Sequence, residues 1–136
     1  MNYIEEQGRV PVKGSFDVSV AGGGVAGVSA ALAARRLGKS VLIIEKSLML
    51  GGLATLGLIN FFVPMCNGRG RQIIFGMAEE LLRASIRYGY DSIPEEWKNG
   101  EPGEGAKTRY VTKYSANIFA MVLMEMIVDE GVTLLL

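Results

Sequence analysis

The sequence has no histidine and only one cysteine, Cys66, among its 136 residues. Histidine is the side chain that most often exchanges protons near neutral pH. A tyrosine, lysine or arginine could serve instead, but none stands in a recognisable setting, so the catalytic residues stay unknown. A single cysteine excludes an internal disulfide framework and suits a reducing compartment such as the cytoplasm. With no second cysteine or histidine to act with, Cys66 is expected to be a small buried residue, and no metal site is expected.

Excess charge and long apolar runs are also missing. The 14 basic and 14 acidic residues cancel, so nothing draws the chain to nucleic acid or to an anionic membrane. The longest apolar tract, 53–66, is too short to span a bilayer and is interrupted by Thr55, Gly57, Asn60 and Pro64. Residues 1–12 include two glutamates and no apolar core, so we do not expect them to form a signal peptide. We therefore expect neither a nucleic acid nor a membrane as partner.

What the sequence does contain is a strand, turn, helix, turn and strand within residues 16–45. A short β-branched strand is expected over 16–21 and a second buried strand over 41–45. Between them, a helix over 25–37 is rich in alanine and should end at Gly38, where a left-handed cap favours glycine. This pattern predicts a parallel βαβ unit.

The first turn of that unit carries G-x-G-x-x-G at Gly22, Gly24 and Gly27. The three glycines would permit a sharp turn, leave room for a pyrophosphate beside the backbone, and let the helix lie close to the strand. The amides at the start of the helix and its dipole would face the phosphates. Glu45, at the tip of the second strand, could accept hydrogen bonds from an adenosine ribose. The alternative is a glycine-rich turn of another α/β unit, with Glu45 a solvated strand end.

A second glycine pair, Gly51-Gly52, follows the second strand and should lie at the same carboxyl edge of the sheet. There the backbone and the Thr55 hydroxyl could contact a cofactor, or the segment could be an ordinary flexible turn. The apolar residues of 56–63 could line a pocket, but a place in the core is favoured.

The rest of the chain is expected to contain two helices and a third strand. Residues 72–88 have the pattern of an amphipathic helix with a solvated charged face. Residues 91–113 form a loop excursion in which Trp97 is either a contact surface or, more commonly, a local anchor. Ser115 should cap a largely apolar helix over 116–130, which Gly131 ends, and a buried strand follows over 132–136.

The fold class is therefore α/β, a Rossmann-like parallel βαβ dinucleotide-binding unit that is incomplete at the C-terminus. In the sheet, 41–45 should lie between 16–21 and 132–136. Three strands make only half of a doubly wound sheet. We expect residues 1–136 to be the N-terminal part of a domain, with the rest of the domain and a substrate domain in the missing C-terminal part of the same protein.

The chain resembles the N-terminus of FAD-dependent oxidoreductases with the glutathione-reductase type of FAD domain. The resemblance covers nearly all residues and is carried by a leader at 9–12, DVSVAGGGVAG, IIEK, LGGLATLG, GRGRQIIFGMAEEL and DEGVTLLL. It departs at Val25, where the family often has proline. Redox cysteines that disulfide reductases carry after Gly-Gly are replaced here by Leu53-Ala54-Thr55.

The resemblance implies FAD as the cofactor and a flavoprotein oxidoreductase acting on a small-molecule substrate that the sequence does not name. It implies that FAD is bound by residues of these motifs, namely Gly22, Gly23, Gly24, Ala26, Gly27, Glu45, Lys46, Gly51, Gly52 and Thr55. The alternatives are an NAD-binding dehydrogenase domain and a non-enzymatic dinucleotide-binding module. We expect residues 1–136 by themselves to bind FAD weakly at most.

Overall fold

The computed structural model describes residues 3–89 and 91–136, and its centre is a three-stranded parallel sheet. The strands are β1 (Val18–Ala21), β2 (Val41–Ile44) and β3 (Thr133–Leu135), in the order β1-β2-β3. Val20 lies beside Ile43, and Ile43 beside Leu134. The expected parallel pairing and the central position of the second strand are confirmed.

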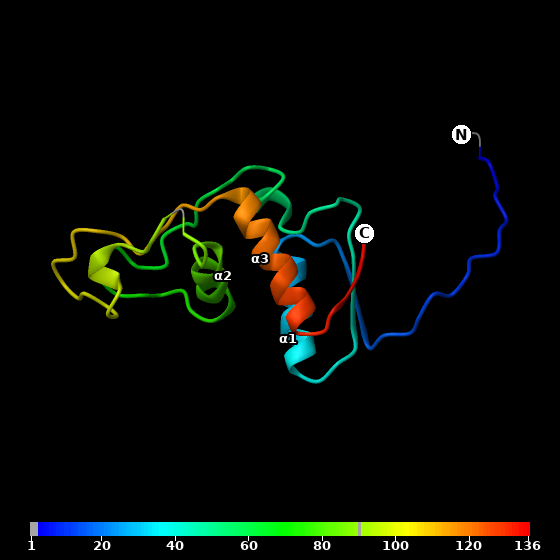
Figure 1. Cartoon of the computed structure of the whole chain (residues 1–136), viewed down its shortest axis with the longest axis horizontal. Helices are drawn as coiled ribbons and strands as arrows, with labels where there is room; N and C mark the ends of the chain where they lie inside the picture. The colour runs from blue at the N-terminus through cyan, green and yellow to red at the C-terminus, as the bar shows by residue number, and fades with distance from the viewer. Residues whose placement is uncertain (1–2, 90) are drawn as a thin grey trace.

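Helices cover one face of this sheet and leave the other open. Val41 and Ile43 are buried beneath α1 (Val25–Arg36) and α3 (Ala116–Asp129), which lie side by side (Figure 1). On the opposite face, Ile44 and Leu135 are 45% and 52% exposed. The expectation of fully buried strands is therefore wrong for one face, because the described residues place no helix over it.

Small side chains allow α1 to pack closely on the sheet. Val28, Ala31 and Leu32 are fully buried, and α1 ends where Gly38 takes the left-handed conformation with φ +78°. The predicted cap is confirmed. In the last turn, the Arg36 guanidinium bonds Glu80 and Glu130, which ties α1 to the helix α2 (Met77–Ser85) and to the end of α3.

The helix α3 is buried on more than one side, as its apolar sequence predicts. Phe119, Val122, Leu123 and Ile127 have no exposed surface, and the Ser115 hydroxyl accepts a hydrogen bond from the Ile118 amide. Met121 and Val128 remain 64% and 63% exposed, however. One apolar stripe of α3 thus faces solvent.

Residues 61–113 form a second lobe with its own small core (Figure 1). Trp97, in the short 3-10 helix η2 (Glu95–Trp97), is 2% exposed, stacks on Tyr110 at 5.2 Å and donates its indole N–H to the Thr108 carbonyl. Trp97 is therefore a local anchor. Cys66 is buried in the same core, as expected.

Two expectations about this region are wrong. The helix predicted over 72–88 spans only 77–85, because Gln72 pairs with Cys66 in an antiparallel bridge and Gly76 adopts φ +67° before the first turn. Most of segment 56–63 is not core, since Leu58, Phe61 and Val63 are all more than half exposed. Within this segment, Phe62 turns inward and packs against Tyr114 and Phe119.

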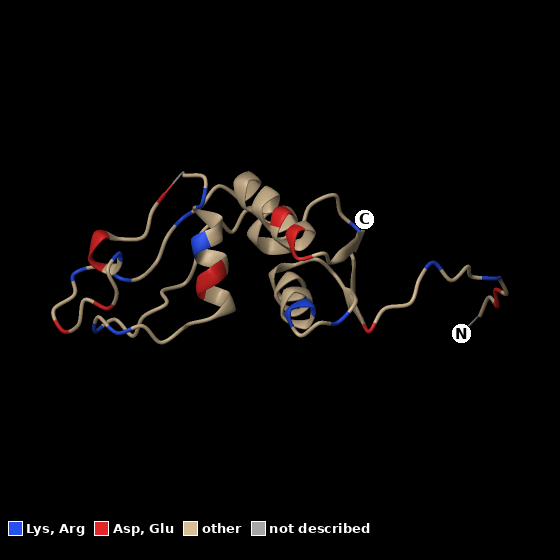
Figure 2. Ribbon diagram, turned by 60° about the horizontal axis from the view of Figure 1, so that its bottom comes forward, with Lys and Arg blue, Asp and Glu red and all other residues tan. Residues whose placement is uncertain are grey.

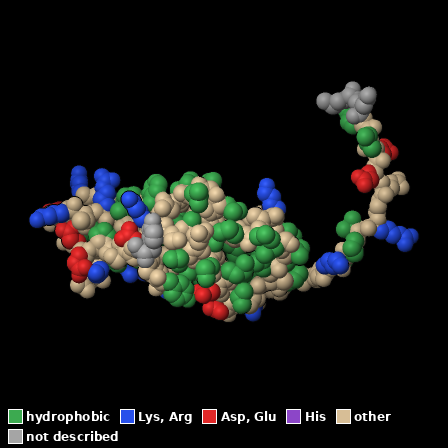
Figure 3. All heavy atoms as spheres, turned by 45° about the horizontal axis from the view of Figure 1, so that its top comes forward, with side chains coloured by type: hydrophobic (Ala, Val, Ile, Leu, Met, Phe, Trp, Pro, Cys, Tyr) green, Lys and Arg blue, Asp and Glu red, His purple; other side chains and the backbone are tan. Residues whose placement is uncertain are grey.

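The surface has mixed charge and much apolar area. Basic and acidic residues are interspersed over the helices and loops (Figure 2), in line with the zero net charge. Hydrophobic side chains gather over the body that holds the sheet (Figure 3). The N-terminal segment extends away from that body, with Ile4, Val10 and Val12 exposed.

Candidate functional site: the carboxyl edge of the sheet

The fingerprint glycines form a turn at the carboxyl edge, between β1 and α1. Gly22 has φ +101° and donates its amide to the Ile44 carbonyl at 2.8 Å, which holds the turn against β2. A Cβ on Gly27 would lie 1.9 Å from the Gly22 carbonyl oxygen, whereas a Cβ on Gly24 would meet nothing within 4 Å. The sixth position of the motif therefore serves close packing, and the third leaves open space beside the backbone.

That open space lies at the start of α1. Gly24 is the N-cap residue, no side chain caps the helix, and its first turn contains no acidic residue. Ala26, in the same turn, is exposed. A helix start of this kind presents backbone N–H groups and the positive end of its dipole, which together favour an anion such as a phosphate.

Glu45 is held against the same turn. One carboxylate oxygen, Oε2, accepts the Gly23 amide at 2.6 Å, and the other, Oε1, accepts the amide and the hydroxyl of Ser47, each at 2.8 Å. The hydrogen bonds from the Ser47 hydroxyl, the Ser47 amide and the Gly23 amide lower the pKa of Glu45. Because these bonds favour the charged form, Glu45 is an ionised acceptor at neutral pH.

The second glycine pair lies against the fingerprint turn. Gly51 donates its amide to the Gly23 carbonyl at 2.8 Å and pairs with Gly24 in a parallel bridge. Both Gly51 and Gly52 have positive φ, and a Cβ on Gly52 would lie 3.3 Å from the Gly24 Cα. The two glycine motifs thus form one backbone surface around Gly24, continued by the short 3-10 helix η1 (Gly52–Ala54).

Two of the predicted residues lie differently. Thr55 is 1% exposed, and its hydroxyl donates to the Leu50 carbonyl at 2.6 Å, so this side chain supports the loop from within. Lys46 is exposed beside Glu45 in the sequence. The other eight predicted residues lie in the turn, in the first turn of α1, in the Gly51-Gly52 pair and at the tip of β2.

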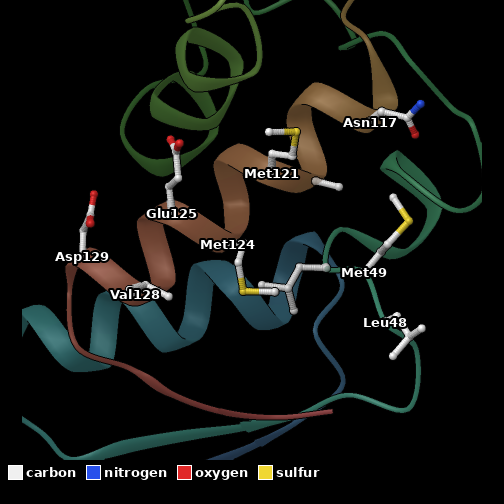
Figure 4. Close-up of a pocket in the computed structure, with 10 residues that line it drawn as sticks. Leu48, Met49, Asn117, Met121, Met124, Glu125, Val128 and Asp129 are labelled. Carbon is white, nitrogen blue, oxygen red and sulfur yellow. The ribbon is translucent and has the colours of Figure 1, made fainter.

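A separate apolar groove lies between the loop after β2 and the exposed stripe of α3. Figure 4 shows Leu48 and Met49 across from Met121, Met124 and Val128, with Asn117, Glu125 and Asp129 along the helix. None of the residues that line it belongs to the predicted cofactor set. The groove is therefore distinct from the glycine surface.

Two residues of the carboxyl edge escaped the sequence analysis. Leu50 packs over the turn, since a Cβ on Gly23 would lie 2.4 Å from its Cδ2 atom. Ser47 binds the Glu45 carboxylate through both its amide and its hydroxyl. A serine two residues after an acidic side chain, where a strand ends, is a local signal that could have revealed this contact.

Across the part of the chain that the structure describes, no helix is long and apolar enough to cross a bilayer. In the same residues, 3–89 and 91–136, no group of three or more cysteine or acidic side chains is arranged to hold a metal ion.

Residues 17–136 match the family described as FAD dependent oxidoreductase. The chain belongs to this family. Its cofactor is therefore FAD, and the parallel βαβ unit is part of a Rossmann-like FAD-binding domain. The fingerprint by itself does not distinguish FAD from NAD, because G-x-G-x-x-G with an acidic strand end occurs in NAD-binding domains as well. The family match decides in favour of FAD.

The chain is also similar to individual proteins and solved structures. A thioredoxin reductase of Ureaplasma parvum serovar 3 is 28% identical over 80 residues, which are 59% of this chain and 26% of that protein. The crystal structure of Thermovibrio ammonificans THI4 superposes with a TM-score of 0.52 at 22% identity, over 88% of this chain and 37% of that one. A ternary complex of aklavinone-11 hydroxylase with FAD and aklavinone gives a TM-score of 0.48 at 19% identity, over 91% and 26%. The chain thus spans well under half the length of these proteins.

Proposed function

We propose that this chain supplies the adenosine diphosphate half of the FAD site of an oxidoreductase. The pyrophosphate would lie on the backbone of Gly22, Gly23, Gly24, Ala26 and Gly27, with Gly51 and Gly52 flanking it. Glu45 would accept a hydrogen bond from the ribose. Lys46, next to Glu45, would reach the edge of the adenosine, and Thr55 would act indirectly by holding the loop after β2.

The observation that carries this proposal is the open space at Gly24. Gly27 and Gly23 are enclosed, so their lack of a side chain is explained by packing within the chain. Gly24 has no neighbour for a Cβ, and its φ of −64° and ψ of 173° are allowed for any residue. Neither packing nor backbone conformation requires glycine here, and an N-cap position is open to several residue types, whereas close approach of a phosphate to an uncapped helix start does favour glycine.

In the reaction, bound FAD would accept or donate a hydride at its flavin ring. The residues of this chain would bind and orient the other end of the cofactor. Ionised Glu45 would fix the ribose relative to the phosphates, because its carboxylate is bonded directly to the Gly23 amide of the phosphate turn. A displacement of the fingerprint turn or of Glu45 would thus move the phosphates and the ribose of the cofactor together.

Further features of the whole protein are part of the proposal. We propose a small-molecule substrate, bound by residues outside this chain, where the remaining part of the FAD domain would also lie. We propose a cytoplasmic protein on the grounds that its one cysteine is free and buried. Hydride transfer through FAD is proposed for the protein as a whole.

The experiment uses ADP as the probe, because the chain presents the adenosine diphosphate end of the site. Amide NMR spectra of residues 1–136 are recorded during titration with ADP into the millimolar range. We expect the largest shifts at Gly22–Gly27 and at Gly51 and Gly52. Glu45→Ala should weaken ADP binding by about 1–3 kcal/mol, the range for a lost charged hydrogen bond.

Asp17→Ala is the matched control. Asp17 is the equivalent carboxylate at the amino edge of the sheet, where it accepts the amide and hydroxyl of Ser40 at 2.8 and 2.7 Å. This variant should bind ADP like the wild type. ADP shifts that cluster elsewhere, for example in the groove of Figure 4, or equal losses in the two variants, would refute the proposed site.

A further inference from the structure

The Glu45 carboxylate is restrained from two sides, because Ser47 donates two hydrogen bonds to it and Gly23 donates one. An ionised carboxylate has about four acceptor positions, two on each oxygen. The amide and hydroxyl of Ser47 use both positions of Oε1, while Gly23 uses one position of Oε2. The Lys46 amide also helps to lower the pKa of Glu45. Of the bonds from Ser47 and Gly23, Oε1 accepts two and Oε2 accepts one, so Oε2 is the oxygen more open to a further donor.

We propose that Ser47 is a positioning residue for the ribose site: it turns the Glu45 carboxylate so that Oε2 bonds the phosphate turn and stays open to a ribose hydroxyl. This inference rests on the proposed function, because it assigns Glu45 to the ribose. Ser47 itself need not touch the cofactor.

The Ser47 hydroxyl has a second acceptor within reach. Its oxygen lies 2.8 Å from Glu45 Oε1 and 3.0 Å from the Met49 carbonyl oxygen, and its one proton can serve only one of them at a time. An ionised acceptor forms the stronger hydrogen bond. The hydroxyl therefore favours Glu45 when the carboxylate is charged and can turn to Met49 when it is protonated, which couples the orientation of Glu45 to its ionisation.

A purely structural role for Ser47, stabilising the turn after β2, is the competing explanation. The chain contains a matched case in Ser40, whose amide and hydroxyl bind the Asp17 carboxylate at the opposite edge of the sheet. There the hydrogen bonds likewise lower the pKa of the carboxyl, and no glycine fingerprint is near. Loss of Ser40 thus measures what a serine of this kind contributes to the fold alone.

Few charged groups surround Glu45. The fingerprint turn contributes only glycines, the loop after β2 contributes Lys46, and the neighbouring end of β3 contributes the terminal carboxylate of Leu136 in the 136-residue chain. Lys46 and this carboxylate are common to all the variants compared below, so their effects cancel.

The test measures the pKa of Glu45 by carboxylate NMR and the affinity for ADP, both in residues 1–136. We expect Ser47→Ala to raise the Glu45 pKa and to weaken ADP binding about three- to ten-fold at neutral pH, as for one lost hydrogen bond. The loss of ADP affinity on acidification should also begin at a higher pH. Ser47→Thr, which keeps a hydroxyl, should restore both values. Ser40→Ala should raise the Asp17 pKa and leave Glu45 and ADP unaffected.

The possible failures are distinguishable. If ADP shifts none of the fingerprint amides in the wild type, the ribose site itself is refuted, whatever Ser47 does. If the wild type binds ADP there and Ser47→Ala has the same Glu45 pKa and ADP affinity, the site stands and the positioning role is refuted. Equal weakening by Ser47→Ala and Ser40→Ala would show a structural role only. Should alanine disturb the turn, Ser47→Cys provides a side chain of similar size with a weaker donor.

Discussion

Gly24 and Gly27 stand three residues apart in one motif, and the structure predicts different effects when a methyl group is added to each: a loss of stability at Gly27 and a loss of ligand affinity at Gly24. At Gly27 the new Cβ would lie 1.9 Å from the Gly22 carbonyl oxygen and 3.2 Å from Val20 Cγ1. Ordinary contact begins at 3.4 Å, so α1 and the turn would have to separate by about 1.5 Å. At Gly24 the methyl group would extend into open space.

The magnitudes follow from these contacts. Overpacking costs about 1–3 kcal/mol, and the upper value applies to Gly27→Ala because the obstacle is backbone and not a flexible side chain. For a chain of this size, that corresponds to a melting temperature lower by about 10 °C. Gly24→Ala exchanges one N-cap residue for a poorer one, at a cost of about 0.5–1 kcal/mol and a shift of about 2–4 °C.

The assay combines thermal melting by circular dichroism with the ADP titration. Gly24→Ala should fold almost normally and yet lose more than about tenfold in ADP affinity, since its methyl group would occupy the phosphate position. Gly27→Ala should be strongly destabilised. The reasoning is refuted if Gly27→Ala melts within about 2 °C of the wild type, or if Gly24→Ala retains wild-type ADP affinity.

Two further predictions concern the second lobe. Burial and the hydrogen bond to Glu79 raise the pKa of Tyr110 to about 12, so the folded state holds this proton more tightly than the unfolded state. The free energy of unfolding should therefore fall as the pH rises from about 10 to about 12, a slope that Tyr110→Phe should reduce in denaturant titrations. Trp97→Ala should cost about 3–5 kcal/mol. Trp97 is the only tryptophan, so the wild type should show the blue-shifted fluorescence of a buried indole, and a solvent-exposed emission would contradict its anchoring role.

Local pattern was a good guide wherever short-range geometry dictates structure. The βαβ unit of residues 16–45 was predictable because strand periodicity, a glycine turn, an alanine-rich helix and a glycine cap agree over a continuous stretch. The helix predicted over 72–88 is longer than the observed one, because local pattern alone does not show where contacts with other segments end a helix. Its amphipathic pattern extends into residues 72–75, but Gln72 pairs with Cys66 and donates its backbone amide to Glu101, a residue far away in the sequence, and these contacts override the pattern.

For this protein, the sequence by itself determined the parallel unit, the dinucleotide fingerprint and the family, since these depend on residue types at fixed spacing. Only the tertiary structure decided which glycine is enclosed and which is open, because Gly27 and Gly24 differ solely in what surrounds them. It also decided that the Thr55 hydroxyl turns inward and that the Ser47 hydroxyl donates a hydrogen bond to the Glu45 carboxylate. Side-chain direction and long-range packing depend on the three-dimensional placement of several segments at once, which spacing along one chain does not encode.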